Sequence, residues 1–132
     1  MIYLNNVDLA ELSTKTSGYT YSTDETVIGK WIDGRNLYRK VFNIGNLNGS
    51  TGSTARAHGI NNFDRAVHLY GSARNQAFEN RLTAGLPYPS VTTQIDVSLN
   101  ADDTNITIYH TQSDYASNYS AVVVMEYIKT AD

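Results

Sequence analysis

The residues that could carry out covalent chemistry are few and poorly spaced for it. A glycosidase needs two carboxylates that flank the bond it breaks. The aspartates available for such a pair are Asp96, Asp102, Asp103 and Asp114. Asp102 and Asp103 are neighbours in a polar turn, where their side chains diverge and where aspartate is favoured for backbone reasons. The sequence also contains no G-x-S-x-G motif and no glycine-rich phosphate loop. We therefore expect no enzyme activity.

The three histidines, His58, His68 and His110, do not follow a metal-binding pattern. No two of them lie two residues apart in one strand, and no H-E-x-x-H motif occurs. The turn around Asp102 lacks the spacing of a calcium loop. The chain contains no cysteine, so disulfides and thiolate metal sites are excluded. We expect no metal and no cofactor, and we expect His68 and His110 to be hydrogen-bonded strand residues.

Two polar loops carry residue types that bind carbohydrate without covalent chemistry. Sugars are held by aromatic faces together with planar amide, carboxylate and guanidinium groups, and such groups belong on loops over a rigid scaffold. The candidate ligand-binding residues are Asp114, Tyr115, Asn118 and Tyr119 in one loop, and Asn46, Asn48, Arg56 and His58 in the other. An equally weighted alternative is that these loops only cover the sheet or meet a neighbouring subunit.

Short strands must position these loops, and the clearest of them form a hairpin. Val27–Ile32 is mostly apolar, Asp33-Gly34 follows, and Arg35–Ile44 alternates between two faces. Asp-Gly is a strong signal for a two-residue type I′ turn, in which both central residues have positive φ. The tryptophan, Trp31, stands next to this turn and is expected to anchor the hairpin.

Further strands are predicted where apolar residues alternate or run together. They are Phe63–Arg74, Ser90–Leu99, Asn105–Thr111 and Ser120–Ile128. The last contains the continuous apolar run Ala121–Met125, which predicts a central strand buried on both faces. Gly45–Asn62 is predicted to be a long loop with a short strand at its end, near Ala57–Ile60. Both prolines lie in Asn75–Pro89, so no central strand should cross that segment.

These elements predict one all-β domain, an antiparallel β-sandwich or small barrel of six to eight short strands with little helix. The 132 residues suffice for a single core. Residues 1–20 are interpreted as a lead-in segment, with one helical turn at Val7–Leu12, and residues 21–132 as the domain. Ten tyrosines suit half-exposed sheet faces, subunit interfaces and sugar-contact surfaces.

The hairpin region resembles the segment that opens the C-terminal domain of many bacteriophage tail-fibre, baseplate and host-recognition proteins. That segment reads approximately Y-S-T-x-E-x-x-x-G-x-W-x-D-G-x-x-x-Y-x-K. The matching residues here are Tyr21, Ser22, Thr23, Glu25, Gly29, Trp31, Asp33, Gly34, Tyr38 and Lys40. The final MEYIKTAD, at Met125–Asp132, is similar to the way such domains end. We expect Tyr21, Glu25 and Tyr38 to be structural residues, like those of the turn.

The resemblance implies a homotrimeric tip domain in the virion tail. It would bind host cell-surface polysaccharide and meet other tail or baseplate proteins. The alternatives are a purely structural trimerising domain with no ligand and, less well supported, a polysaccharide-degrading tip. The net charge of −3 gives no sign of nucleic-acid binding. No apolar window predicts membrane insertion and no signal peptide opens the chain, so synthesis in the host cytoplasm is expected.

Overall fold

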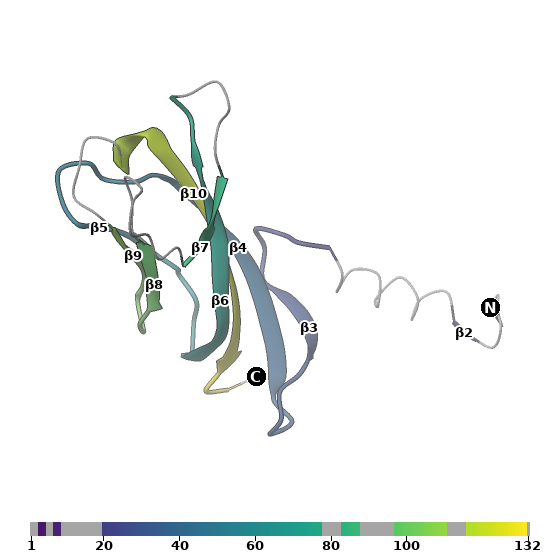
Figure 1. Cartoon of the computed structure of the whole chain (residues 1–132). Coiled ribbons are helices and arrows are strands. Elements are labelled where there is room, and N and C mark those ends of the chain that lie inside the picture. The colour runs from purple at the N-terminus through teal and green to yellow at the C-terminus, as the bar shows by residue number, and fades with distance from the viewer. Residues whose placement is uncertain are drawn as a thin grey trace.

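The computed structural model describes residues 3–4, 7–8, 20–77, 83–87, 97–110 and 116–131, and the structural statements below concern these residues (Figure 1). They form strands and a single 3-10 turn, η1 (Ala116–Asn118). The strands are β1 (Tyr3–Leu4), β2 (Val7–Asp8), β3 (Thr26–Lys30), β4 (Asn36–Asn46), β5 (Ser53–Ala57), β6 (Phe63–Asn75), β7 (Thr83–Leu86), β8 (Val97–Ala101), β9 (Asn105–His110) and β10 (Tyr119–Lys129).

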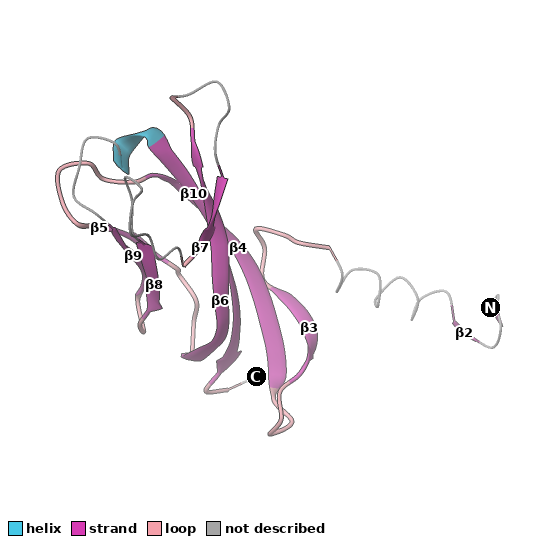
Figure 2. Cartoon of the chain, viewed as in Figure 1, coloured by secondary structure: helices cyan, strands magenta, loops and turns pink. Residues whose placement is uncertain are grey.

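Eight of these strands form two antiparallel sheets, and the fold is all-β and sandwich-like, as predicted. The large sheet has the order β3-β4-β10-β6-β7, and the small sheet has the order β5-β9-β8. The small sheet lies on the side of β6 and β7, which β8 contacts, and away from β3 (Figure 2). None of the described helical residues forms a helix long and apolar enough to cross a membrane.

The hydrophobic core lies between the two sheets. Its largest contribution comes from the odd-numbered residues of β10, which alternate onto one face: Tyr119, Ala121, Val123, Met125 and Tyr127. Ile106 and Ile108 of β9 face them and are completely buried. Strand β9 presents these two isoleucines on one face because its sequence alternates apolar with polar residues.

Strand β10 is central, as predicted, but it is not fully buried on both faces. Among its even-numbered residues, Val124 and Ile128 are buried, whereas Glu126 is half-buried and Val122 is 39% exposed. The physical reason is that the small sheet covers only one face of the large sheet. The even-numbered residues therefore share a face whose neighbours on β4 and β6 are largely polar.

The predicted hairpin is confirmed, but its turn is not type I′. The N–H of Gly34 donates to the carbonyl of Trp31, and the N–H of Trp31 donates to the carbonyl of Arg35. Gly34 has φ of +90°, whereas Asp33 is not among the residues with positive φ. This is the pattern of a three-residue loop in which only the last residue requires the left-handed conformation that glycine tolerates. The extra residue accounts for the pairing of Lys30 with Asn36.

Three segments contain strands that the sequence did not predict there. The predicted loop at Gly45–Asn62 holds β5, which pairs with β9 and starts earlier than the strand predicted at Ala57–Ile60. It also holds Leu47, which is 2% exposed and belongs to the core. Strand β7 lies in the proline-containing segment, but at the sheet edge, as the prolines required. Val7–Asp8 is a strand paired with β1 and not the start of a helical turn.

The second half of the chain follows the predicted order. Strand β9 matches its prediction closely. Strand β8 begins at Val97, and the earlier part of the strand predicted at Ser90–Leu99 lies outside the described residues. The turn between β8 and β9 is shorter than predicted because β8 extends to Ala101. The N–H of Asp102 closes this turn on the carbonyl of Asn105.

Candidate functional site

The structure describes two of the four residues proposed in the loop before β10. Asp114 and Tyr115 lie outside the described residues. Asn118 is half-buried in η1, where its carbonyl accepts a hydrogen bond from the N–H of Gln76. Tyr119 is only 4% exposed and is part of the core, so its proposed role in ligand binding is corrected to a packing role.

His58 also proves to be a structural residue. It is 3% exposed, and its ring lies 4.7 Å from the ring of Phe63. Its Nδ1 accepts a hydrogen bond from the N–H of Ile60, so its Nε2, 2.9 Å from the carbonyl oxygen of Asp102, is the donor of the neutral ring. Nε2 therefore joins the segment after β5 to the β8–β9 turn, Nδ1 is bound within that segment, and neither ring nitrogen is left for a ligand.

The other proposed residues of this loop do not converge on one site. Arg56 is exposed on β5, an edge strand of the small sheet, and donates to the carbonyl of Ala55. The side-chain oxygen of Asn48 accepts from the N–H and hydroxyl of Ser50, which shapes a local turn. Asn46 is an exposed residue at the end of β4. Arg56, on β5, and Asn118, in η1, thus remain predicted ligand contacts from separate elements.

Of the two histidines predicted to be hydrogen-bonded strand residues, His110 on β9 is one, whereas His68 on β6 is exposed and its Nδ1 lies 3.7 Å from the nearest carboxylate oxygen of Glu126. The Nε2 of His110 lies 2.9 Å from the hydroxyl of Thr54, and both side chains are buried between β5 and β9. No group of three or more histidine, aspartate or glutamate side chains within the described ranges could hold a metal ion.

The residues that carry the family resemblance meet around the end of β10. The carboxylate of Glu25 accepts hydrogen bonds from the hydroxyl of Tyr127 and from Nζ of Lys129, 2.6 Å away. The ring of Tyr127 stacks on Tyr38 with centroids 5.7 Å apart, and Lys129 Nζ lies over Tyr38. Burial, followed by the hydrogen bond to Glu25, raises the pKa of Tyr127, which keeps its hydroxyl a donor.

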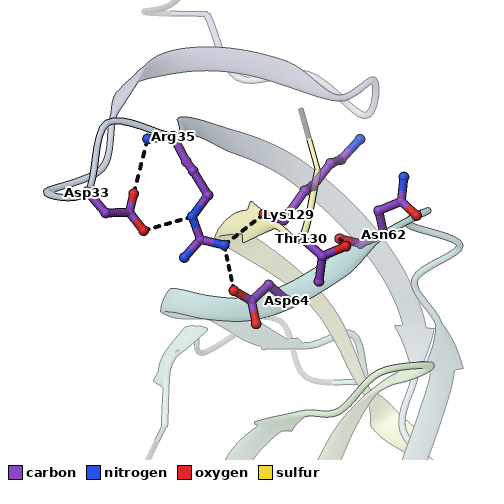
Figure 3. Close-up of polar contacts among 6 residues, drawn as sticks. All are labelled: Asp33, Arg35, Asn62, Asp64, Lys129 and Thr130. Atoms are coloured by element: carbon purple, nitrogen blue, oxygen red, sulfur yellow. Dashed lines mark hydrogen bonds and ion pairs between the residues drawn. The ribbon is translucent and has the colours of Figure 1, made fainter.

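Arg35 makes a second connection to the same strand end (Figure 3). Its Nε donates to Asp33 at 2.7 Å, and its Nη1 donates to Asp64 at 2.6 Å and to the carbonyl of Lys129 at 2.8 Å. The N–H of Thr130 then donates to the carbonyl of Asn62. The backbone N–H of Arg35 donates to Asp33 and holds the pKa of that carboxyl below its usual range.

We call the set Glu25, Asp33, Arg35, Tyr38, Asp64, Tyr127 and Lys129 the strand-end cluster. It joins the opening and closing parts of the resembling sequence into one unit, although they lie about 100 positions apart. Its polar groups bind one another, which supports the structural role expected for Glu25, Asp33 and Tyr38. Trp31 is half-buried and lies outside the core, and its backbone closes the hairpin through hydrogen bonds with Gly34 and Arg35.

Tyr21, which was expected to be structural, is part of an exposed cluster. This cluster lies on the outer face of the large sheet, which points away from the small sheet and the core. Its ring is 57% exposed, and the guanidinium carbon of Arg39 lies 4.1 Å from its centroid. Its hydroxyl lies 3.2 Å from that of Tyr70, which donates to Glu126 at 3.3 Å. His68 contacts the Tyr70 ring, with centroids 4.3 Å apart. These five residues form the outer-face cluster.

The strand register explains why these five residues meet. Glu126 on β10 pairs with Arg39 on β4 and with His68 on β6. Tyr70 pairs with Val124, which lies two residues before Glu126 and points to the same face. Residues that are paired across antiparallel strands point to the same face. Tyr21 is brought over this face because the carbonyl of Ser22 accepts the N–H of Val41, and because Arg39 donates to the carbonyl of Thr20.

The outer-face cluster combines an exposed aromatic ring with hydrogen-bonding groups. Because Tyr70 donates to Glu126, the Tyr21 hydroxyl donates to Tyr70. Partial burial, the contact with Tyr21 and the charge of Glu126 raise the pKa of Tyr70, so it keeps its proton. His68 Nδ1 lies 3.7 Å from the Glu126 carboxylate, and the His68 side chain is 61% exposed. Aromatic, guanidinium, imidazole and carboxylate groups are thus available on one face.

A groove of about 450 Å³ runs between the first half of β6 and the β8–β9 turn. Two of the carboxylates that line the groove already make ion pairs or hydrogen bonds with other groups of the protein. Asp64 pairs with Arg35, and Asp102 accepts the N–H groups of Thr104 and Asn105, which lowers the pKa of Asp102. Arg65 and His68, which line this groove, are its exposed basic residues.

The comparisons with family models, curated proteins and solved structures gave no match to this chain. The candidate site accordingly depends on the geometry described above. The sequence did contain a signal for the outer-face cluster, since Arg39, Tyr70 and Glu126 each lie on the more polar face of a predicted strand. Finding it required the strand order, which places β4 and β6 on either side of β10.

Proposed function

We propose that this domain is the tip of a bacteriophage tail-fibre or baseplate protein, where it binds host cell-surface polysaccharide without covalent chemistry. The resemblance of its first hairpin and last strand to such domains supports the biological setting. The observation that carries the binding function is the outer-face cluster, because an exposed tyrosine ring beside guanidinium, carboxylate and imidazole groups is the combination that holds sugars.

In this proposal each member of the cluster has a separate role. The exposed part of the Tyr21 ring packs against the apolar C–H face of a pyranose. The Arg39 guanidinium, held over that ring and bonded to the carbonyl of Thr20, fixes the ring orientation. Glu126 and His68 exchange hydrogen bonds with sugar hydroxyls. A single such site is weak, and several copies per tail would supply avidity.

The test is a binding titration of the purified domain against a panel of bacterial cell-wall polysaccharides. Tyr21→Ala should weaken binding roughly tenfold, because it removes the stacking surface. Tyr109→Ala is the matched control, since Tyr109 is 52% exposed on the small sheet and should bind as the parent does. An Arg56→Ala arm tests the loop residue predicted from the sequence.

If Tyr21→Ala bound polysaccharide as the parent does and Arg56→Ala lost binding, the site would instead lie in the Gly45–Asn62 segment, around β5. No binding to any polysaccharide would favour the second candidate function, a structural trimerising domain. The observation that favours this candidate is the exposure of apolar side chains on and beside the large sheet, at Val27, Ile32 and Val122. Such side chains suit contact with another protein.

A further inference from the structure

We infer that the polysaccharide bound by the outer-face cluster carries negative charge, as carboxylate or phosphate groups beside its sugar rings. This inference rests on the proposed function and adds the chemical class of the ligand. Its basis is the net charge of the outer face of the large sheet, which is opposite in sign to the net charge of the whole chain.

The outer face of the large sheet is positively charged. The register directs three arginines to it, Arg39 from β4 and Arg65 and Arg74 from β6. The single acidic residue of the described strands on this face is Glu126. Three arginines and one glutamate give a formal charge of +2, whereas the whole chain carries −3.

Strand β6 arranges part of this charge as a row. Reading along its outer face, the row contains Arg65, His68, Tyr70, Ser72 and Arg74. Arg74 and Arg65 pair with residues four positions before and after the β10 partner of Tyr70, so at about 3.3 Å per residue each lies roughly 13 Å from Tyr70. A polymer that stacks a sugar near the two tyrosines would therefore meet a guanidinium on each side.

The two outer arginines are available to a ligand. Arg65 and Arg74 are both exposed, and neither makes an ion pair or side-chain hydrogen bond in the part of the chain that the structure describes. Arginine matches carboxylate and phosphate oxygens with two parallel hydrogen bonds. Exposed charges that do not bind other protein groups are the ones that a charged ligand can use.

The acidic residues that would oppose an anionic ligand are largely engaged elsewhere, apart from Asp24, which is exposed three residues after Tyr21. Glu25, Asp33 and Asp64 belong to the strand-end cluster, where Lys129 and Arg35 neutralise them. Asp102 is bound to backbone N–H groups in the β8–β9 turn. Because salt screens charges beyond about 8 Å at physiological ionic strength, the local charge of the outer face outweighs the distant negative charge.

The test compares three soluble probes in the same binding titration: polygalacturonate, which carries carboxylates, poly(glycerol phosphate), which carries phosphates, and neutral dextran. We expect at least one anionic probe to bind more tightly than dextran, and its affinity to fall as NaCl rises from 50 to 500 mM, because salt screens the attraction. The two anionic arms distinguish carboxylate from phosphate as the recognised group.

The variant Arg65→Gln/Arg74→Gln should weaken anionic binding about three- to tenfold, as expected for two exposed charges, and leave dextran binding unchanged. Lys30→Gln is the matched control, because it removes an exposed positive charge that lies beside the hairpin turn and outside the row of residues on β6. Unfolding transitions measured for both variants exclude a change of fold as the cause.

Three results would overturn the inference. In the first, dextran binds as tightly as the anionic probes, its binding depends on Tyr21, and salt does not change the affinity. The proposed function would then stand, but the ligand would not need to carry charge. Equal binding of single-stranded DNA and the anionic glycans would show a polyanion surface without sugar recognition. If none of the three probes and no cell-wall polysaccharide bound to either the parent or Tyr21→Ala, the proposed function would be contradicted as well.

Discussion

At the scale of single residues, the structure separates groups that hold the protein together from groups that face solvent. Glu25, Asp33 and Tyr38 were predicted to be structural. Glu25 and Tyr38 contact residues near the end of β10 directly, and Asp33 is linked to that end through Arg35. His58 and Tyr119 were predicted to bind a ligand and are buried. Their burial could not be predicted, because the Asp102 carbonyl that binds His58 and the core residues around Tyr119 come from distant parts of the chain.

Asp33 should make the protein more sensitive to acid. Its pKa is below the ordinary value of 3.8 in the folded chain, so its contribution to stability is present above pH 3.8 and is lost as the pH falls through the folded value. We expect Asp33→Asn to be less stable than the parent at pH 7. The difference should shrink towards pH 2, as measured by urea unfolding at several pH values.

Asp103→Asn is the control for this experiment, since Asp103 is an exposed aspartate in the β8–β9 turn. It should leave the urea midpoint unchanged at every pH. A gap between the parent and Asp33→Asn that stayed constant from pH 7 to pH 2 would show that the charge of Asp33 does not stabilise the strand end.

At the scale of elements, strands with alternating apolar residues were predictable and strands without them were not. β4, β6, β9 and β10 each carry such a pattern, and each was predicted. β5 has the sequence STARA, with no large apolar residue. It is a strand because its backbone pairs with β9 and because Thr54 binds His110, and neither partner is visible in the local sequence.

The β6–β10 pairing depends on the absence of a side chain at Gly71. A Cβ atom there would lie 2.1 Å from the carbonyl oxygen of Val122 and 3.0 Å from the Cα of Val123. Both atoms are backbone, so relief requires the two strands to separate. We expect Gly71→Ala to cost about 3 kcal/mol or more, or to prevent folding. Thermal unfolding followed by circular dichroism measures the effect.

Gly85→Ala is the matched control, because Gly85 lies on the neighbouring strand β7 with nothing within 4 Å of its Cβ position. It should change the unfolding temperature little. If the free energy of unfolding of Gly71→Ala were within about 1 kcal/mol of that of the parent, β6 and β10 would have to separate more easily than two closely packed backbones should.

At the scale of the whole molecule, the all-β class was predictable from composition and turn spacing, whereas the choice between two packed sheets and a small barrel was left open. The order of the strands was not predictable, because alternation shows which side chains share a face of a strand and not which strands are neighbours. The outer-face cluster depends entirely on that order. Its residues come from the segment before β3 and from β4, β6 and β10.

Three chains are expected to associate in solution, as the family resemblance implies. The exposed apolar side chains of Val27, Ile32 and Val122 offer contact surface for such an assembly. Sedimentation equilibrium of the purified domain should give the mass of a trimer. Ile32→Asp, at the 91% exposed tip of the hairpin, tests whether that tip takes part in the assembly. A monomer at every concentration would contradict the expectation.

The central position of β10 has a consequence for synthesis of the protein on the ribosome. The hairpin β3–β4 and the pair β6–β7 belong to one sheet only through β10, which follows both of them in the chain. Until β10 emerges, β4 and β6 each expose a long unpaired edge, and such edges pair readily with other chains. Translation that stops before Tyr119 should therefore yield an aggregating fragment and not a partly working domain.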